Sequence, residues 1–181
     1  MNIALSYALL KKKVVLVGLD IRNPQLTNYL HLAHKGHLTP YLSDLSYDAQ
    51  DIIIPSKIND YLDVVPAGPV PPNPGELLMS DRLDELVAHL KEQYDYVVID
   101  SAPIGMVSDT FLFNRFSDIT LYISRVGHTP KDSAEFINHT HETEKLKNMY
   151  CILNGTKEDS GTKGTYGYYS YGKGYGYSKK K

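Results

Sequence analysis

Two aspartates each follow a run of apolar residues, and together they could support phosphate chemistry. Asp20 follows VVLVGL, and Asp100 ends YDYVVID. In open α/β sheets, ligands bind where the strands end, so both carboxylates would emerge at one edge. A carboxylate near phosphates is useful mainly through Mg²⁺, which cancels the repulsion between like charges. The plainer alternative is that each aspartate only favours the turn after its strand.

Two other polar residues also come at the ends of predicted strands. Arg22 lies two residues after Asp20 and would emerge at the same edge, although a solvated side chain is the simpler alternative. Asn154 ends the segment MYCILN, and its amide could pair with the edge of a nucleotide base as donor and acceptor. An asparagine before Gly155 is also a common turn residue, so the pattern leaves both possibilities open.

These residues need strands and helices to position them, and the apolar pattern predicts both in alternation. Runs rich in β-branched residues predict five strands, the first of them apolar throughout, as in a parallel sheet buried on both faces. The predicted strands are Val14–Gly18, Tyr61–Gly68, Tyr94–Asp100, Ile119–Ser124 and Met149–Gly155. Helices are predicted within 1–13, near Leu26–Leu30 and Pro40–Leu45, and over Leu83–Leu90, Val107–Phe116 and Lys131–Leu146. The alternation predicts an α/β domain with a mostly parallel sheet.

The apolar pattern stops at Thr156, where Gly, Tyr, Lys and Ser begin to dominate. That composition cannot form a packed core, so we expect a domain over 1–155 and a flexible, disordered tyrosine-rich tail over 156–181. Six lysines against Glu158 and Asp159 give the tail a net charge of +4, which leaves −6 of the total of −2 on the domain. An acidic domain argues against nucleic-acid binding. A single cysteine, Cys151, suits a reducing cytosol.

The chain resembles the bacterial tyrosine kinase (BY-kinase) family, the P-loop kinases of capsule and exopolysaccharide export, over nearly its whole length. VVLVGLDIRNPQL is similar to the family's Walker A′ motif, and YDYVVIDSAPIGMVSD to its Walker B motif with the residues that follow. GPVPPNPGELL is similar to a proline-rich segment that is quite specific to the family. The tyrosines of the tail complete the resemblance.

The resemblance implies a three-layer P-loop-NTPase-like fold and an ATP- and Mg²⁺-dependent protein-tyrosine kinase that regulates capsule or exopolysaccharide synthesis and export. Asp100 would hold Mg²⁺, Asp20 would orient the tyrosine hydroxyl and share the metal, and Arg22 would contact phosphate or a neighbouring subunit. Asn154 would read adenine. The intact protein would form a homo-oligomer at the cytoplasmic face of the cell membrane, through an N-terminal region or a partner such as a transmembrane activator or polysaccharide co-polymerase. The expected phosphoacceptors are Tyr166, Tyr168, Tyr169, Tyr171, Tyr175 and Tyr177.

Two departures from the family pattern affect these expectations. The family usually has an aspartate where this chain has Gly18, so Asp20 and Asp100 must share the metal and base roles. In addition, no G-x-x-x-x-G-K-[ST] loop occurs in the sequence, although the family places one directly before the helix that MNIALSYALLKKK resembles. Such a loop cradles the β- and γ-phosphates. We therefore expect the chain to begin just after its own phosphate loop, to bind ATP weakly and to have little kinase activity alone.

Two alternatives stay open at this point. The chain could be a non-catalytic interaction module that serves as a phosphoacceptor and binds a membrane partner. It could instead be an ATPase similar to ParA or MinD with an unrelated Gly/Tyr tail. The proline-rich segment and the tail argue against the second alternative.

Overall fold

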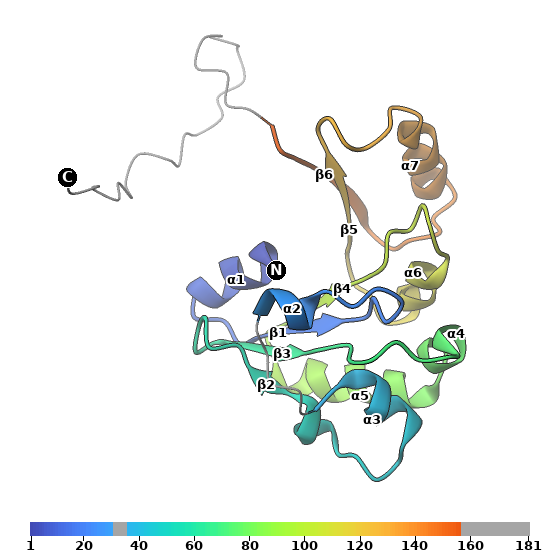
Figure 1. The fold of residues 1–181 in the computed structure, drawn as a ribbon. Helices are drawn as coiled ribbons and strands as arrows, with labels where there is room; N and C mark the ends of the chain where they lie inside the picture. Colours follow the sequence, from blue (N-terminus) through green and yellow to red (C-terminus); the bar gives the residue numbers. More distant parts are fainter. Residues whose placement is uncertain (31–35, 157–181) are drawn as a thin grey trace, which may run out of the picture.

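The computed structural model describes residues 1–30 and 36–156, which form an α/β fold with two sheets (Figure 1). The larger sheet has the order β2-β3-β1-β4, and the smaller one pairs β5 with β6. All pairs are parallel except β2 with β3. The strands are β1 (Val14–Gly18), β2 (Ile54–Pro55), β3 (Leu62–Val65), β4 (Tyr96–Asp100), β5 (Thr120–Arg125) and β6 (Met149–Asn154).

Helices lie on both faces of the larger sheet, with α1 on one side and α5 on the other (Figure 1). The described helices are α1 (Asn2–Leu9), α2 (Leu26–Leu30), α3 (Leu38–Ser43), α4 (Pro74–Leu78), α5 (Asp81–Gln93), α6 (Asp109–Leu112) and α7 (Ser133–Glu142), with single 3₁₀ turns η1 (Ala49–Ile52) and η2 (Phe113–Arg115). Each helix–sheet–helix sandwich of this kind needs a central strand that is apolar on both faces. The three-layer architecture expected from the sequence is confirmed.

β1 is the strand that separates the two hydrophobic cores. Val14 and Leu16 pack with Ala4 and Ala8 of α1, whereas the alternate residues of the strand face α5. All five positions of β1 are buried. The alternation follows from the two-residue period of a strand, and it explains why the sequence of β1 contains no polar residue.

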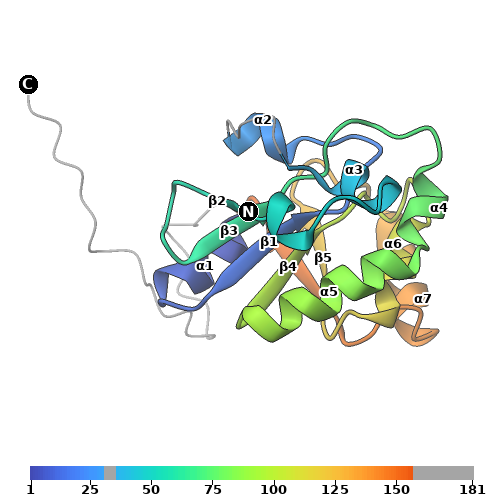
Figure 2. The same ribbon diagram turned by 90° about the horizontal axis from the view of Figure 1, so that it is seen from below.

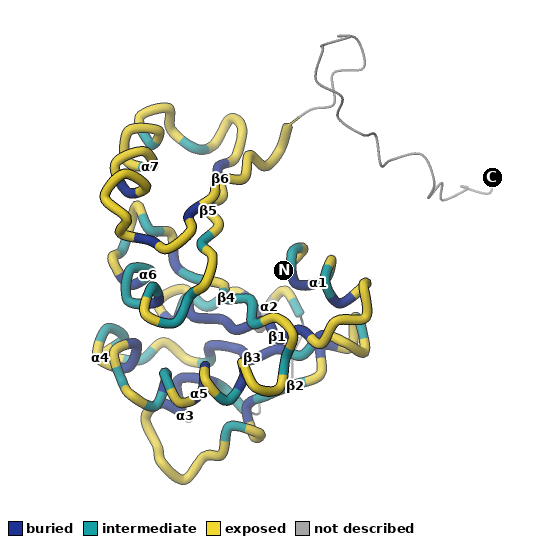
Figure 3. Tube along the Cα trace, turned by 180° about the vertical axis from the view of Figure 1, so that it is seen from behind, coloured by how far each residue is buried: buried dark blue, intermediate teal, exposed yellow. Residues whose placement is uncertain are grey.

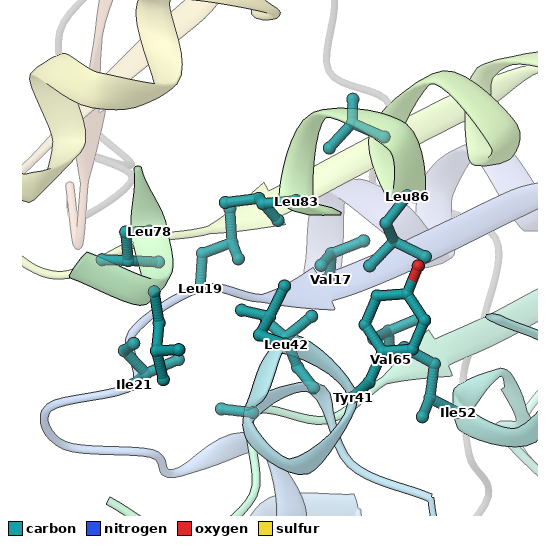
Figure 4. Close-up of a cluster of buried hydrophobic side chains, with 14 of the residues drawn as sticks. Val17, Leu19, Ile21, Tyr41, Leu42, Ile52, Val65, Leu78, Leu83 and Leu86 are labelled. Carbon is teal, nitrogen blue, oxygen red and sulfur yellow. The ribbon is translucent and has the colours of Figure 1, made fainter. Parts of the chain in front are cut away.

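The core on the α5 face is the larger one (Figure 4). Leu83, Leu86, Val87 and Leu90 recur at helical spacing and form the buried stripe of α5. Acidic residues in the first turn and Lys91 in the last turn suit the helix dipole. These leucines pack against the odd-numbered side of β1 and against Leu42 of α3. The core therefore fixes the carboxyl end of β1 relative to the helices around it.

The smaller sheet is covered much less than the larger one (Figure 3). Leu121 and Ile123 of β5 are 40% and 49% exposed, and Tyr150 and Leu153 of β6 are 61% and 57% exposed. α7 runs beside this sheet, yet only Thr140 of the helix is buried. β5 and β6 are thus apolar strands that are only partly covered.

All five predicted strands are present within a few residues of the expected bounds. The apolar pattern does not predict η1, the short antiparallel strand β2, or α4, which begins at Pro74 in the proline-rich segment. Proline fits the first turn of a helix because its missing N–H has no helical partner there. The expected single sheet is two sheets among the described residues. The predicted flexible tail lies almost wholly outside them, and none of the helices they form is long and apolar enough to cross a membrane.

Candidate functional site

The ends of β1 and β4 bring Asp20 and Asp100 together. Gly18 is the register partner of Asp100 in the parallel β1–β4 pair. Just beyond the ladder, the N–H groups of Leu19 and Asp20 both donate to the carbonyl oxygen of Asp100, at 2.7 and 3.1 Å. The backbone after β1 is therefore tied to the last residue of β4, and the two carboxylates predicted from the sequence lie at one edge of the sheet.

The pKa of Asp100 is raised above the ordinary value of an aspartate. Partial burial is the main cause, the α-amino group of Met1 acts in the opposite direction, and the negative charge of Asp20 raises the pKa further. The side chain still reaches solvent. A carboxylate under these conditions is stabilised by any cation that enters the site, because burial and a like charge both disfavour its charged form.

The amino end of α1 lies on the same side of the sheet as the two carboxylates. The ring of Tyr7, near the end of α1, stacks on Tyr96 at the start of β4 with centroids 4.0 Å apart. α1 therefore runs antiparallel to β4, which brings its first residue toward the end of the strand. The influence of the Met1 amino group on Asp100 agrees with this direction. A helix amino end favours anions, so it adds positive potential next to the carboxylates.

Asp20 also stabilises the turn after β1, as the simpler interpretation of this residue predicts. Its Oδ1 accepts a hydrogen bond from the N–H of Asn23 at 3.0 Å. No hydrogen bond to Oδ2 occurs within the part of the chain that the structure describes. One carboxylate oxygen therefore holds the loop after β1, and the other is available to a ligand.

Arg22 pairs with Asp109, a residue that has no local signal of function in the sequence. Its Nε and Nη2 donate to the two carboxylate oxygens of Asp109 at 2.5 and 3.1 Å. Asp109 is 6% exposed and begins α6, and the bond to it is the main reason that the pKa of Arg22 is raised. The forked geometry suits a guanidinium and a carboxylate. Arg22 thus joins the loop after β1 to the segment after β4.

Asn154 is the last residue of β6, in the smaller sheet, and is exposed. Its carbonyl accepts a hydrogen bond from Val126 at 2.9 Å. None of the described contacts joins its amide to Asp20 or Asp100, so an adenine-reading role stays a prediction. The six tail tyrosines lie outside the described residues.

Gly18 occupies a crowded position between the ends of β1 and β3. A Cβ atom there would approach the backbone nitrogen of Ala67 to 3.3 Å and a methyl group of Leu26 to 3.4 Å. These contacts are tighter than most real ones, so the neighbours would have to shift. Position 18, where the family pattern has its other aspartate, therefore leaves little room for a side chain in this fold.

Asp20 and Asp100 could bind Mg²⁺ in the way that carboxylates of nucleotide-binding sites do. Within the described ranges, no cluster of three or more His, Cys, Asp or Glu residues could hold a metal ion alone. Mg²⁺ usually takes only one or two protein carboxylates, and phosphate and water complete its shell. Asp20 and Asp100 supply that number. Two hollows of about 330 and 480 Å³ lie elsewhere, and neither is lined by these aspartates.

Comparison with known proteins identifies close relatives, although no protein-family model matches the chain. The chain is 32% identical to the tyrosine-protein kinase YwqD of Bacillus subtilis, over 93% of this chain and 69% of the relative. It is 33% identical to the tyrosine-protein kinase CpsD of Streptococcus agalactiae, over 95% and 74%. It is 31% identical to the tyrosine-protein kinase wzc of Salmonella typhimurium, over 94% of this chain but only 23% of the relative.

Solved structures agree with the sequence comparison. The chimerical protein CapA2B2 matches with a TM-score of 0.76 and 32% identity, over 84% of this chain and 66% of the other. The kinase domain of the Escherichia coli tyrosine kinase ETK matches with a TM-score of 0.76 and 28% identity, over 91% and 64%. The chain thus spans about two thirds of these structures. MinD of Aquifex aeolicus, at 22% identity and a TM-score of 0.65, shares the fold. The chain belongs to the family of bacterial tyrosine-protein kinases, the BY-kinases of capsule and exopolysaccharide systems.

Proposed function

We propose that this chain contributes the metal-binding and acceptor parts of a kinase that transfers the γ-phosphoryl group of ATP to tyrosine hydroxyls. The observation that carries the proposal is the joined end of β1 and β4, where Asp20 and Asp100 share one edge. Membership in a tyrosine-kinase family favours a kinase function over the two alternatives, a non-catalytic interaction module and a MinD-like ATPase. The similarity of this chain to MinD extends to the fold alone.

Each residue has a distinct part in the proposed mechanism. Asp100, with Asp20, would hold Mg²⁺, which neutralises the charge on the phosphates when it is bound. Asp20 would orient the phenol and accept its proton as the phenolic oxygen bonds to the γ-phosphorus and the bond to ADP breaks. Arg22 acts through its pair with Asp109, which keeps the Asp20 loop beside the residues that follow Asp100. Asn154 would contact adenine.

The tail would be the acceptor. Each phosphate adds about −1.5 to −2 charge at neutral pH, so two or three phosphates would cancel the tail's positive charge and more would invert it. Attraction to the acidic domain of a neighbouring subunit would then turn into repulsion. We propose a homo-oligomer at the inner face of the membrane, in contact with a transmembrane activator, whose association is graded in this way.

The test is a phosphotyrosine assay with Mg²⁺-ATP, read by mass spectrometry. The chain alone is expected to give little phosphotyrosine, because it contains no phosphate loop. The chain with a G-x-x-x-x-G-K-S loop joined before Met1 is expected to modify the tail, and Asp100→Asn in that form is expected to abolish the modification. Phenylalanine at the six tail positions is the matched acceptor control. Equal phosphorylation with and without Asp100 would overturn the proposed role of the carboxylate.

A further inference from the structure

An open hollow of about 330 Å³ lies on the α5 face of the larger sheet, and neither Asp20 nor Asp100 lines it. It is formed by the residues that follow α3, by the start of η1 and by the first half of α5. Figure 2 shows α3 and α5 in front of the larger sheet. Ligand pockets usually measure about 300–1,000 Å³, so this hollow suits a side chain of a bound peptide better than a large cofactor.

The walls of the hollow include aromatic and aliphatic side chains. Tyr41 is 6% exposed and packs into the core beneath the hollow, whereas Tyr47 and Leu45 are 40% and 84% exposed. The guanidinium of Arg82 lies over the Tyr41 ring, 4.1 Å from its centroid. Such walls favour another aromatic ring, which gains free energy both from the apolar area that it buries and from contacts between rings.

The polar groups of the hollow have hydrogen-bonding capacity to spare. Nη2 of Arg82 donates to the carbonyl oxygen of Tyr47 at 2.6 Å, but the buried Nε of Arg82 has no acceptor among the residues that the structure describes. A buried donor without an acceptor costs free energy. Within the same residues, the carboxylate of Glu85 forms neither a hydrogen bond nor an ion pair. A hydroxyl group suits both side chains, since it can accept from a guanidinium and donate to a carboxylate.

The charge of the hollow disfavours an anionic ligand. With His89 neutral, Asp48 and Glu85 against Arg82 give the lining side chains a net charge of −1. The pKa of Tyr41 is raised, mainly by burial; Arg82 acts in the opposite direction, and the negative charges of Glu85 and Asp48 raise the pKa further. A phosphate group would meet these two carboxylates, whereas a peptide with cationic residues would be attracted to them.

We propose that this hollow receives an unmodified tyrosine from the tail of a second copy of the chain. The tail has the required chemistry, because its tyrosines combine an aromatic ring with a hydroxyl group and its lysines give it a net charge of +4. The last described residues follow β6, on the α1 side of the larger sheet, whereas the hollow lies on the α5 side (Figures 1 and 3). The tail of a neighbouring copy therefore reaches the hollow more directly than the chain's own tail.

Phosphorylation of the docked tyrosine would release the tail. A phosphate adds about −1.5 to −2 charge at neutral pH, here beside Asp48 and Glu85, and it replaces the hydroxyl that donates a hydrogen bond. The hollow would thus bind the tail before modification and not after it. This release rests on the proposed kinase function, whereas the docking of the unmodified tail does not.

The other hollow, of about 480 Å³, fits the tail less well although Asp60 and Glu92 make it acidic too. Asp63 in this hollow already accepts a hydrogen bond from the hydroxyl of Tyr94 at 2.7 Å. Lys13 also lines it, and an ammonium group there repels the lysines of the tail. This second hollow therefore serves as the internal control for general attraction between a basic tail and an acidic surface.

The test is photo-crosslinking between copies of the full chain in the absence of nucleotide. In one copy p-benzoylphenylalanine replaces Leu45, and the second copy is labelled with heavy nitrogen so that mass spectrometry identifies its peptides. Cross-links from position 45 to residues 165–181 of the heavy copy are expected. Glu85→Arg is expected to lower their yield about fivefold or more, because it reverses a charge that attracts the tail. Glu92→Arg, on the same helix but in the other hollow, is the matched control and is expected to leave the yield unchanged.

A competitor peptide tests the effect of phosphate. An excess of a synthetic peptide with the sequence of residues 165–181 is expected to remove the cross-link, and the same peptide with its tyrosines phosphorylated is expected to leave it in place. Equal competition by the two peptides would overturn release by phosphorylation.

The remaining outcomes decide whether the hollow is the docking site. Cross-links confined to the light copy would assign the hollow to the chain's own tail and overturn the proposal. Cross-links of equal yield from p-benzoylphenylalanine in place of Tyr61, in the other hollow, would overturn it too, because the attraction would then be general. Since no nucleotide is present, the result does not depend on whether the chain is an active kinase.

Discussion

β1 and β5 are both short and largely apolar, but they have very different surroundings. β1 lies between two paired strands and two helical layers, and it is buried at every position. β5 has one paired neighbour, and its leucine and isoleucine face solvent. Apolar side chains stabilise a fold only where other elements cover them, since the free energy comes from the area removed from water. The larger sheet is therefore expected to contribute most of the free energy of folding of this chain, and the smaller sheet to contribute less.

Three ion pairs hold the segment 109–118, which precedes β5, against the larger sheet and its helices. Arg22 pairs with Asp109, Lys91 with Asp118, and Arg115 with Asp84, and these are all the ion pairs within residues 1–30 and 36–156. Each has one member in the first 100 residues and one in the segment 109–118. These partly solvent-accessible pairs surround apolar contacts of the same segment, because Phe113 is buried in the core on the α5 face and Leu112 and Phe116 pack against it.

The largest expected difference between the regions is in core substitutions. Leu16→Ala, in fully buried β1, should lower the free energy of unfolding by about 2–5 kcal/mol. Leu121→Ala, the matched change in β5, should lower it by less than about 1 kcal/mol, because the side chain is already 40% exposed. Urea unfolding followed by circular dichroism measures both. Equal losses would show that β5 is covered in solution.

A smaller effect is expected at the ion pair between Arg22 and Asp109, which joins the loop after β1 to α6. Arg22→Ala leaves the buried carboxylate of Asp109 without its partner, so it should speed limited proteolysis within 101–118 and lower the unfolding temperature less than Leu16→Ala does. Arg22→Lys should rescue only part of the loss, because an ammonium cannot reproduce the forked contact. Arg125→Ala is the control, since Arg125 forms no ion pair among the described residues. Proteolysis rates unchanged in Arg22→Ala would contradict the connecting role.

A stabilising substitution is expected at the site itself. The pKa of Asp100 is raised in the folded chain, so the folded state is penalised as pH rises from the ordinary aspartate value of about 4 through the raised value. Asp100→Asn should therefore raise the unfolding temperature near neutral pH, and the gain should vanish below about pH 4, where the carboxyl is protonated in both states. Asp60→Asn, at the opposite end of the strands, is the control. A gain independent of pH would assign the effect to something other than charge.

The smallest expected effect is that of the metal alone. Without a phosphate loop the two carboxylates should hold Mg²⁺ weakly, so millimolar MgCl₂ should raise the unfolding temperature by about one degree or less. The shift should be absent in Asp100→Asn. A shift of the same size in both proteins would indicate general screening by the salt.

The sequence is sufficient to predict the helices and strands whose own apolar periodicity determines which residues are buried. Strands such as Val14–Gly18 and the helix around Leu83–Leu90 carry periodicity that needs no tertiary information. It was also sufficient to place Asp20 and Asp100 at one edge, because parallel strands end on the same side. Their catalytic and metal-binding roles stay predictions.

The features that the sequence does not predict depend on partners far along the chain. β2 is two residues long and exists only because β3 lies beside it. Asp109 was part of the quoted Walker B segment, yet its pairing with Arg22 spans 87 positions and has no local signal. The division into two sheets was also missed, since a list of strands does not say which neighbours are present.

The crowding at Gly18 has a consequence for any attempt to restore a second carboxylate there. An aspartate introduced there alone would meet the backbone of the 66–68 segment at once, so its neighbours would have to yield by a few tenths of an ångström before it could be tolerated. How far the Ala67 backbone and the Leu26 side chain can shift would therefore set the cost of a second carboxylate at position 18.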